Sequence, residues 1–250
     1  KFITAFGEDI HAGEIQHSCR ENGIDITHSR SVSGASTSTY MFITDENGDM
    51  QLAVSDMEIY SYLTPEYIAS KLDVINNASL CVIDTNLPAE TIQYLCENCT
   101  VPIFADPVST AKAVKLLPVL GKIHTIKPNM LEAALLTGIP VNDERSARKA
   151  VDILLELGVR QVFLSMGAAG VLYGNARGKK RIPNYPAEIR NTTGAGDSFM
   201  AALVMAYLSE FSTEKAARCG LAAAAICIEG ENTINEKLSR QAVLDRISEN

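Results

Sequence analysis

Short apolar runs rich in branched residues alternate along this chain with longer segments of helical periodicity, and this alternation constrains the fold more than any other feature. Four of the runs predict buried strands, at residues 80–83, 101–105, 123–126 and 161–165. Thr64 with Pro65 predicts the start of one intervening helix, and Asp143 and Gly158 predict the two ends of another. Strands that alternate with helices form a mainly parallel sheet covered on both faces. The predicted fold class is therefore α/β, with three layers.

The overall composition excludes several classes of function. The 250 residues are 46% hydrophobic, which is enough to bury a substantial core, and the net charge is −8. An acidic chain lacks the basic stripe of a nucleic-acid-binding protein, although it can still hold phosphate at a local site. No apolar run reaches the roughly 18 to 20 residues that span a bilayer. The six cysteines fit reduced thiols in a cytoplasmic protein better than zinc, because the one CxxC pair (Cys96 and Cys99) has no second pair or histidine cluster.

The stretch STSTYMFITDENGDMQLAV (residues 36–54) departs from the α/β pattern, because polar and apolar residues alternate in it on both sides of Asn47-Gly48. Asn-Gly supplies the positive φ angles of a tight hairpin turn. The pattern predicts a two-stranded hairpin over residues 35–57. An ordinary edge hairpin and a flap that forms a small accessory layer fit the spacing equally well.

The stretch NTTGAGDSFM (residues 191–200) places glycines at the start of a helix that is predicted to run to Leu208. The first turn of a helix has unpaired N–H groups and a partial positive charge, so Gly194, Ala195 and Gly196 predict an anion-binding turn. Asp197 has two interpretations that spacing alone leaves equal. It complements the helix dipole, which is worth ~0.3–1 kcal/mol, or it is a general base beside an anion hole.

The stretch KPNMLEAALLTG (residues 127–138) predicts a helix with a capping box formed by Asn129 and Glu132, and with Gly138 at its end. A functional interpretation is compatible with that cap. Asn129 and Glu132 would organise Mg²⁺ and its water shell near phosphates, and Lys127 would add positive charge. Both interpretations hold together if the cap lies at the carboxyl end of a strand, where open α/β sheets bind ligands.

Polar residues also follow the other predicted strands, and they point to one ligand-binding edge of the sheet. They are Asp84, Asn86, Asp106, Ser165 and Gly167. In VFLSMGAAGVLYG (residues 162–174), a strand is predicted to end at Ser165, and Gly167 and Gly170 allow a nucleotide to lie against the backbone. An ordinary hairpin turn before a second strand at Val171 is the stronger interpretation of that stretch.

Together, in this order, these three motifs resemble the ribokinase-like carbohydrate kinases of the phosphofructokinase B type, and the resemblance covers essentially the whole chain. NTTGAGDSFMAALV matches the C-terminal signature of that family, and FITAFGEDIHAGEIQHSCRENGID matches its early Gly-x-Asp segment. The resemblance implies an ATP-dependent kinase in which Asp197 activates the acceptor hydroxyl and residues 194–196 form the anion hole. It also implies that Asn129 and Glu132 lie by Mg²⁺ and the phosphates, and that Ser165, Gly167 and Gly170 line the nucleotide side.

Within that family, the hairpin stretch is most similar to the pseudouridine kinases, as are GDMQLAVSDMEI and INEKLS. This similarity implies transfer of the γ-phosphoryl group to the 5′-hydroxyl of pseudouridine, with the hairpin as a lid. Thr39 and Asp56 are the candidate lid residues for reading the base, chosen by their position and polarity alone. Family members often use a monovalent cation, K⁺, and Thr193 is placed in the corresponding neighbourhood. An exposed apolar hairpin face favours a homodimer formed through the lid.

Three further expectations complete this interpretation. The kinase core would comprise residues 1–34 and 58–250, with a first strand at residues 1–5. Family members begin with a strand that carries a sugar-binding aspartate and a Gly-Gly motif, so the sequence is expected to lack that beginning. The alternatives are a kinase of another small sugar or nucleoside (ribose, fructose or adenosine) and a non-catalytic sensor on the same fold.

Overall fold

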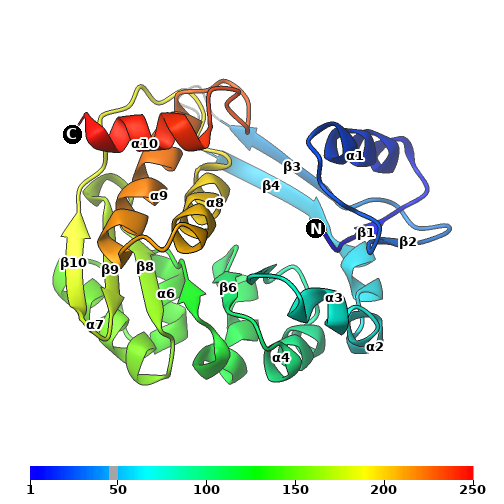
Figure 1. The fold of residues 1–250 in the computed structure, drawn as a ribbon, viewed down its shortest axis with the longest axis horizontal. Helices are drawn as coiled ribbons and strands as arrows, with labels where there is room; N and C mark the ends of the chain where they lie inside the picture. Colours follow the sequence, from blue (N-terminus) through cyan, green and yellow to red (C-terminus); the bar gives the residue numbers. More distant parts are fainter. Residues whose placement is uncertain (45–49, 250) are drawn as a thin grey trace. The chain divides into compact units, whose positions relative to one another are not determined.

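The computed structural model describes residues 1–44 and 50–249, and the chain divides into two compact units, residues 1–101 and 102–250 (Figure 1). The predicted Asn47-Gly48 turn lies outside the described residues. The assignment of residues 35–57 as a lid separate from the core stays a prediction, and the hairpin belongs to the first unit.

The strands of the second unit form a sheet in the order β10-β9-β8-β7-β6. They are β6 (Ile103–Asp106), β7 (Thr125–Ile126), β8 (Gln161–Ser165), β9 (Val171–Asn175) and β10 (Gly178–Ile182). Strands β6, β7 and β8 are parallel, whereas β8, β9 and β10 are antiparallel to their neighbours. The parallel part was predicted, and β10 was not.

Two predicted strands begin later than their apolar runs do. Strand β6 begins after Pro102, which has no N–H to donate to a neighbouring strand. Strand β7 begins after Ile123, which is 1% exposed but is the C-cap residue of the preceding 3-10 helix. An apolar residue such as Ile123 extends the apolar run in the sequence whether it is buried in a helix cap or in a strand, so the predicted strand was too long.

Helices cover both faces of this sheet. The helical segments of the second unit are α5 (Thr110–Ala113), η2 (Val114–Lys122), α6 (Met130–Thr137), α7 (Glu144–Glu156), η3 (Gly167–Ala169), α8 (Ala195–Leu208), α9 (Thr213–Ile228) and α10 (Arg240–Ser248). On β9, a Cβ on Gly174 would collide with Val151 of α7, whereas the hydroxyl of the adjacent Tyr173 donates to Glu214 of α9 at 3.4 Å. Because successive strand residues face opposite sides, α7 and α9 lie on opposite faces, as the predicted three-layer fold requires.

The first unit contains short elements around a small apolar cluster. They are β1 (Ala5–Phe6), α1 (Ile10–Glu21), β2 (Arg30–Ser31), β3 (Thr39–Thr44), β4 (Met50–Asp56), η1 (Glu58–Tyr62), α2 (Pro65–Ala69), α3 (Leu72–Asn76), β5 (Cys81–Asp84) and α4 (Ala89–Asn98). Ala5, Val32, Ile59 and Leu63 pack together in the cluster. The strand predicted at residues 1–5 was wrong except at Ala5, because β1 has only two residues and pairs in parallel with β2.

The Gly-x-Asp segment holds the chain that leads into the hairpin. The Asp9 carboxylate caps α1 by accepting from the Ala12 N–H at 2.8 Å, and it also accepts from the Thr37 hydroxyl at 2.8 Å. A Cβ on Gly7 would collide with the Ala35 carbonyl. The base of the hairpin is therefore attached to the start of α1.

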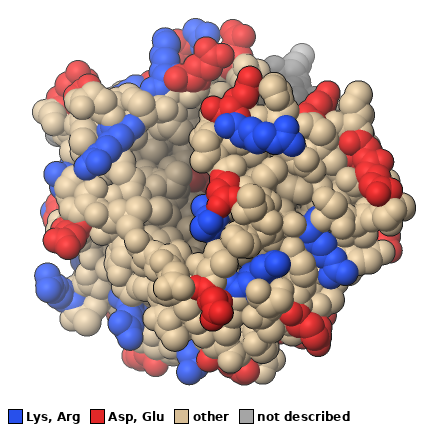
Figure 2. Space-filling view, turned by 45° about the vertical axis from the view of Figure 1, so that its right-hand side comes forward, with Lys and Arg blue, Asp and Glu red and all other residues tan. Residues whose placement is uncertain are grey.

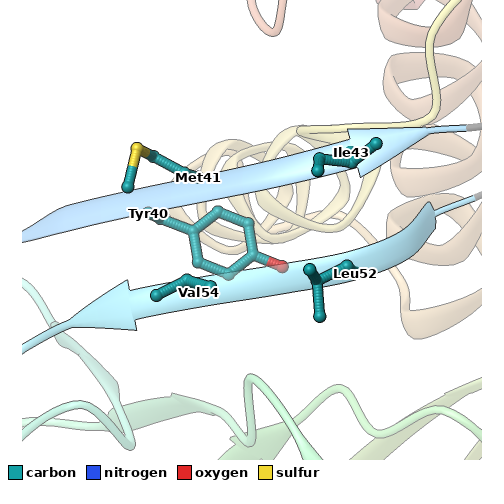
Figure 3. Close-up of a pocket in the computed structure, with 5 residues that line it drawn as sticks. All are labelled: Tyr40, Met41, Ile43, Leu52 and Val54. Atoms are coloured by element: carbon teal, nitrogen blue, oxygen red, sulfur yellow. The ribbon is translucent and has the colours of Figure 1, made fainter.

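The predicted hairpin is confirmed as the antiparallel pair β3 and β4. Met41 lies opposite Val54 and Ile43 opposite Leu52, so these four side chains share one face, which we call the apolar hairpin face (Figure 3). Their side chains are 56–62% exposed, whereas Tyr40 belongs to the opposite face. The first unit thus exposes a contiguous apolar surface.

The surface drawn in Figure 2 carries lysine and arginine side chains scattered among acidic ones. Across residues 1–44 and 50–249, no helix has both the length and the apolar composition to cross a bilayer. All six cysteines lie within the described residues and are free thiols.

Candidate active site

Three parallel strands of the second unit deliver polar residues to one edge of the sheet. Asp106 is the last residue of β6, Lys127 follows β7, and Ser165 is the last residue of β8. Asn129 forms a parallel bridge with Ser165, whose N–H donates to the Pro128 carbonyl at 2.9 Å. The predicted gathering of polar residues at a strand-end edge is confirmed for these three strands.

The glycine-rich turn leads directly into α8, as predicted. Gly194 is the N-cap residue in the left-handed region, at φ +85°, where only glycine is free of steric cost. A Cβ at this position would also collide with the Thr233 carbonyl oxygen. Asp197 lies exposed in the first turn of α8. A helix N-terminus with glycines at 194 and 196 suits an anion, because the backbone can approach it closely.

A buried ion pair lies against this turn. The Lys127 ammonium is 3.1 Å from Oδ2 of Asp106, and the two side chains are 10% and 17% exposed. The same ammonium would be 3.3 Å from a Cβ placed on Gly196. The cation predicted at the phosphate region therefore lies next to the turn that is predicted to bind an anion. The sequence predicts Asp106 as an edge residue without a specific role, and its position at the end of a buried apolar run is the signal for its place here.

The capping box of α6 is formed as predicted. Asn129 Oδ1 accepts from the Glu132 N–H at 2.9 Å, and Glu132 Oε2 accepts from the Asn129 N–H at 2.9 Å. Gly138 ends the helix at φ +70°. Glu132 is only 4% exposed, and burial raises the pKa of its carboxyl, although the Asn129 hydrogen bond and the Lys127 charge oppose that rise. The cap thus holds a buried carboxylate near Lys127.

The carboxylates at this edge fit a magnesium ion shared with phosphates. The Asp106 charge raises the pKa of Glu132, the Lys127 charge lowers it, and Lys127 forms an ion pair with Asp106. In the described part of the chain, no group of three or more His, Cys, Asp and Glu side chains is placed to hold a metal. Mg²⁺ usually takes one or two protein carboxylates and completes its shell with water and substrate phosphates. The donor set matches that habit.

The turn between β8 and β9 follows the stronger interpretation, because the two strands pair as an antiparallel hairpin. Gly170, at φ +92°, approaches the Ile182 carbonyl so closely that any Cβ would collide with it. Gly167, at φ +55°, has no atom within 4 Å of its Cβ position. Close packing against Ile182 therefore explains why position 170 is glycine, whereas Gly167 borders open space.

The two predicted lid residues lie opposite one another on the hairpin of the first unit, Thr39 on β3 and Asp56 on β4. The Thr39 hydroxyl donates to the Thr37 carbonyl at 3.3 Å, and Asp56 accepts from the Glu58 N–H at 3.1 Å. They are cross-strand partners at the end of the hairpin that is attached to α1. Their role toward a substrate stays a prediction.

The buried carboxyl of Glu132 makes stability depend on pH in a predictable direction. A folded-state pKa above that of the unfolded chain favours the protonated form, so stability falls as pH rises from about 4.5 through the folded-state pKa. Glu132→Gln keeps an oxygen for the capping box and removes this penalty. We expect it to raise the melting temperature relative to the unmodified chain at pH 8, and to do so less at pH 4.5.

Calorimetry at the two pH values measures this difference. Glu66→Gln is the matched control, because hydrogen bonds lower the pKa of the exposed Glu66 in the first turn of α2, so its effect should have the opposite sign. If Glu132→Gln raises the melting temperature less at pH 8 than at pH 4.5, the pKa of Glu132 is not raised in the folded state.

Comparison with known proteins places this site in a family context. The sequence model of the pfkB family of carbohydrate kinases matches residues 1–240. The pseudouridine kinase of Escherichia coli (strain K12) is 31% identical over 250 residues, which cover 98% of this chain and 79% of that protein. A solved carbohydrate kinase from Agrobacterium tumefaciens is 28% identical, with a TM-score of 0.83 over 98% of this chain and 79% of its own. Arabidopsis thaliana ribokinase, solved in complex with ribose and ATP, shares the fold with a TM-score of 0.84 at 23% identity, covering 98% and 81%.

Proposed function

Since the chain belongs to the pfkB family of carbohydrate kinases, we propose that it transfers the γ-phosphoryl group of ATP to the 5′-hydroxyl of pseudouridine, giving pseudouridine 5′-phosphate. The broader statement, that it is an ATP-dependent phosphotransferase acting on a sugar or nucleoside, follows from the family. The choice of pseudouridine rests on the 31% identity to the E. coli pseudouridine kinase along nearly the whole chain.

The observation that carries the chemistry is the exposed carboxylate of Asp197 at the glycine-rich start of α8. We assign Asp197 as the base that takes the proton of the acceptor hydroxyl, and the backbone of Gly194, Ala195 and Gly196 as the anion hole. Oriented N–H groups stabilise the charge that develops on a phosphoryl group in transfer, and a carboxylate beside them can activate the attacking oxygen.

ATP and Mg²⁺ are the proposed partners of the remaining edge residues. Asp106, Asn129 and Glu132 would hold Mg²⁺ and its water shell, which neutralises the phosphate charge when bound. Ser165 and Gly167 border the side assigned to the nucleotide, whereas Gly170 supports that side through packing. The free thiols of all six cysteines support action in the cytoplasm.

A monovalent cation site is proposed beside the anion hole. The Cys227 thiol lies 3.7 Å from the Thr193 carbonyl and 3.4 Å from the Thr233 carbonyl, so two carbonyl groups from separate segments converge there. Asn191 joins the same segments by donating to the Glu231 carbonyl at 3.0 Å. Carbonyl oxygens suit K⁺, and titration of activity with KCl against NaCl measures the preference.

The apolar hairpin face is the proposed contact of a homodimer. Side chains that are 56–62% exposed on a two-stranded sheet gain stability when a second copy covers them. Sedimentation of the Met41→Lys variant tests this contact, because a charge on this face should shift a dimer toward monomer.

A substrate panel tests the proposed specificity. With ATP and Mg²⁺, the purified protein is offered pseudouridine, uridine, adenosine, ribose and fructose, and ADP formation is followed for each. We expect pseudouridine to give the highest kcat/KM, by at least about tenfold, because a site built for a base edge rejects substrates that lack it. Ribose or adenosine ahead of pseudouridine would refute the choice of substrate while leaving the kinase class intact.

A further inference from the structure

We propose that Lys127 is a catalytic residue whose ammonium contacts the transferring phosphoryl group, and that Asp106 is the positioning residue that holds this ammonium against the anion-binding turn. The inference rests on the phosphotransferase activity of the proposed function, but not on the identity of the sugar or nucleoside. It adds Asp106, and the pairing of the two residues, to what the family resemblance implies.

The location of the ammonium is the first observation. Lys127 is 8% exposed, which is rare for lysine because the charged group loses its hydration. Its ammonium nitrogen lies 3.3 Å from the Cβ position of Gly196, and Gly196 belongs to the turn assigned as the anion hole. Glycine at 196 therefore leaves the ammonium and the helix N-terminus side by side, and both attract the same anion.

The partner of the ammonium is the second observation. Asp106 is its one ion-pair partner among residues 1–44 and 50–249, at 3.1 Å. An ammonium has three donors. The pair with Asp106 accounts for one of them, and further donors are available to phosphate oxygens. A buried pair of this kind is weak evidence for stability, since desolvation offsets the attraction. Its place at the anion-binding turn favours a role in binding charge.

The backbone that carries Asp106 is the third observation. Val108 has φ +62°, a conformation that costs a branched residue roughly 1–3 kcal/mol. The Val108 N–H donates to Oδ1 of Asp106 at 3.0 Å, and Oδ2 holds Lys127. One carboxylate oxygen is thus fixed by the strained turn and the other orients the lysine.

The chemical step gives the ammonium its role. The acceptor oxygen forms a bond to the γ-phosphorus, the bond to the bridging oxygen breaks, and its electron pair stays on the β-phosphate of ADP. The acceptor proton goes to Asp197, and Lys127 exchanges no proton. Charge spreads over the equatorial oxygens of the phosphoryl group during transfer. A fixed cation therefore stabilises the transition state more than it stabilises ATP in the ground state.

Steady-state kinetics of Lys127→Met test the proposal, using whichever panel substrate is turned over. We expect kcat to fall by at least about 100-fold, as for the loss of one preorganised donor, with the KM of the sugar or nucleoside within about threefold. Lys127→Arg should recover part of kcat. Lys180→Met is the control, because it removes an exposed lysine that pairs with Glu214 at 2.7 Å, and its kcat should stay unchanged.

Binding provides a readout that does not depend on turnover. ADP–Mg²⁺ with aluminium fluoride mimics the transferring phosphoryl group, and calorimetry compares its affinity with that of ADP–Mg²⁺ alone. Lys127→Met should weaken the mimic by at least about tenfold and ADP by less than about threefold. Lys127→Gln gives the same comparison if the methionine variant does not fold. Equal weakening of both ligands, or kcat within about threefold of the unmodified enzyme, would overturn the proposal.

Discussion

Replacing Asp197 with asparagine is expected to lower kcat by about two to four orders of magnitude while the Kd of ATP stays within a few-fold. A positioned general base contributes roughly 10² to 10⁴ in rate, and an amide cannot accept the hydroxyl proton. Asp197 is exposed in the first turn of α8, where a substrate hydroxyl can reach it. Single-turnover kinetics with the accepted substrate, together with calorimetry for ATP, measure both quantities.

The competing interpretation is that Asp197 only complements the dipole of α8, an effect of ~0.3–1 kcal/mol on stability. Glu90→Gln is the matched control, because Glu90 is also an exposed acid in the first turn of a helix, α4. We expect Asp197→Asn and Glu90→Gln to lose similar small amounts of stability, and only Asp197→Asn to lose turnover. If Asp197→Asn keeps more than about a tenth of kcat, Asp197 is not the base.

Replacing Gly194 with alanine is expected to lower kcat by at least about 100-fold, the second large effect. The left-handed conformation at φ +85° disfavours a Cβ, and the Thr233 carbonyl occupies the place where that Cβ would lie. The turn must therefore shift, which displaces the N–H groups that we assign to the anion hole. The same shift moves Thr233 and should weaken any dependence on K⁺.

Gly138→Ala is the control that separates backbone strain from the collision with Thr233 as causes of the lower kcat. Gly138 also lies in the left-handed region, at φ +70°, but nothing is within 4 Å of its Cβ position. The strain alone costs about 1–2 kcal/mol of stability. We expect Gly194→Ala to lose more stability than Gly138→Ala, because only the first adds a collision to the strain, and we expect Gly138→Ala to keep its kcat. If Gly194→Ala is stable and active, the turn does not form the anion hole.

The parts of the site that lie within one short stretch of sequence could be predicted. The capping box of Asn129 and Glu132 and the start of α8 depend on residues three or four apart, so local rules locate them. The gathering of Lys127 and Ser165 at one edge followed from the rule that parallel strands end together. Several helix ends followed from the same local chemistry, as at Thr64 and Gly138.

The parts that depend on distant contacts could not be predicted. The ion pair of Asp106 and Lys127 forms because β6 and β7 are neighbours in the sheet, and the order of strands in a sheet cannot be read from the sequence. The positive φ of Val108 contradicts the preference of a branched residue, so no propensity indicates it. The packing of Gly170 on Ile182 depends on strand β10, and that strand was not predicted.

The burial of Glu132 also bears on how the chain would drift in evolution. A carboxylate whose pKa is raised by burial destabilises the fold at neutral pH, and glutamine would serve the capping box without that cost. A chain released from catalysis, such as a sensor that only binds its ligand, would therefore gain stability by a change of one base in the codon.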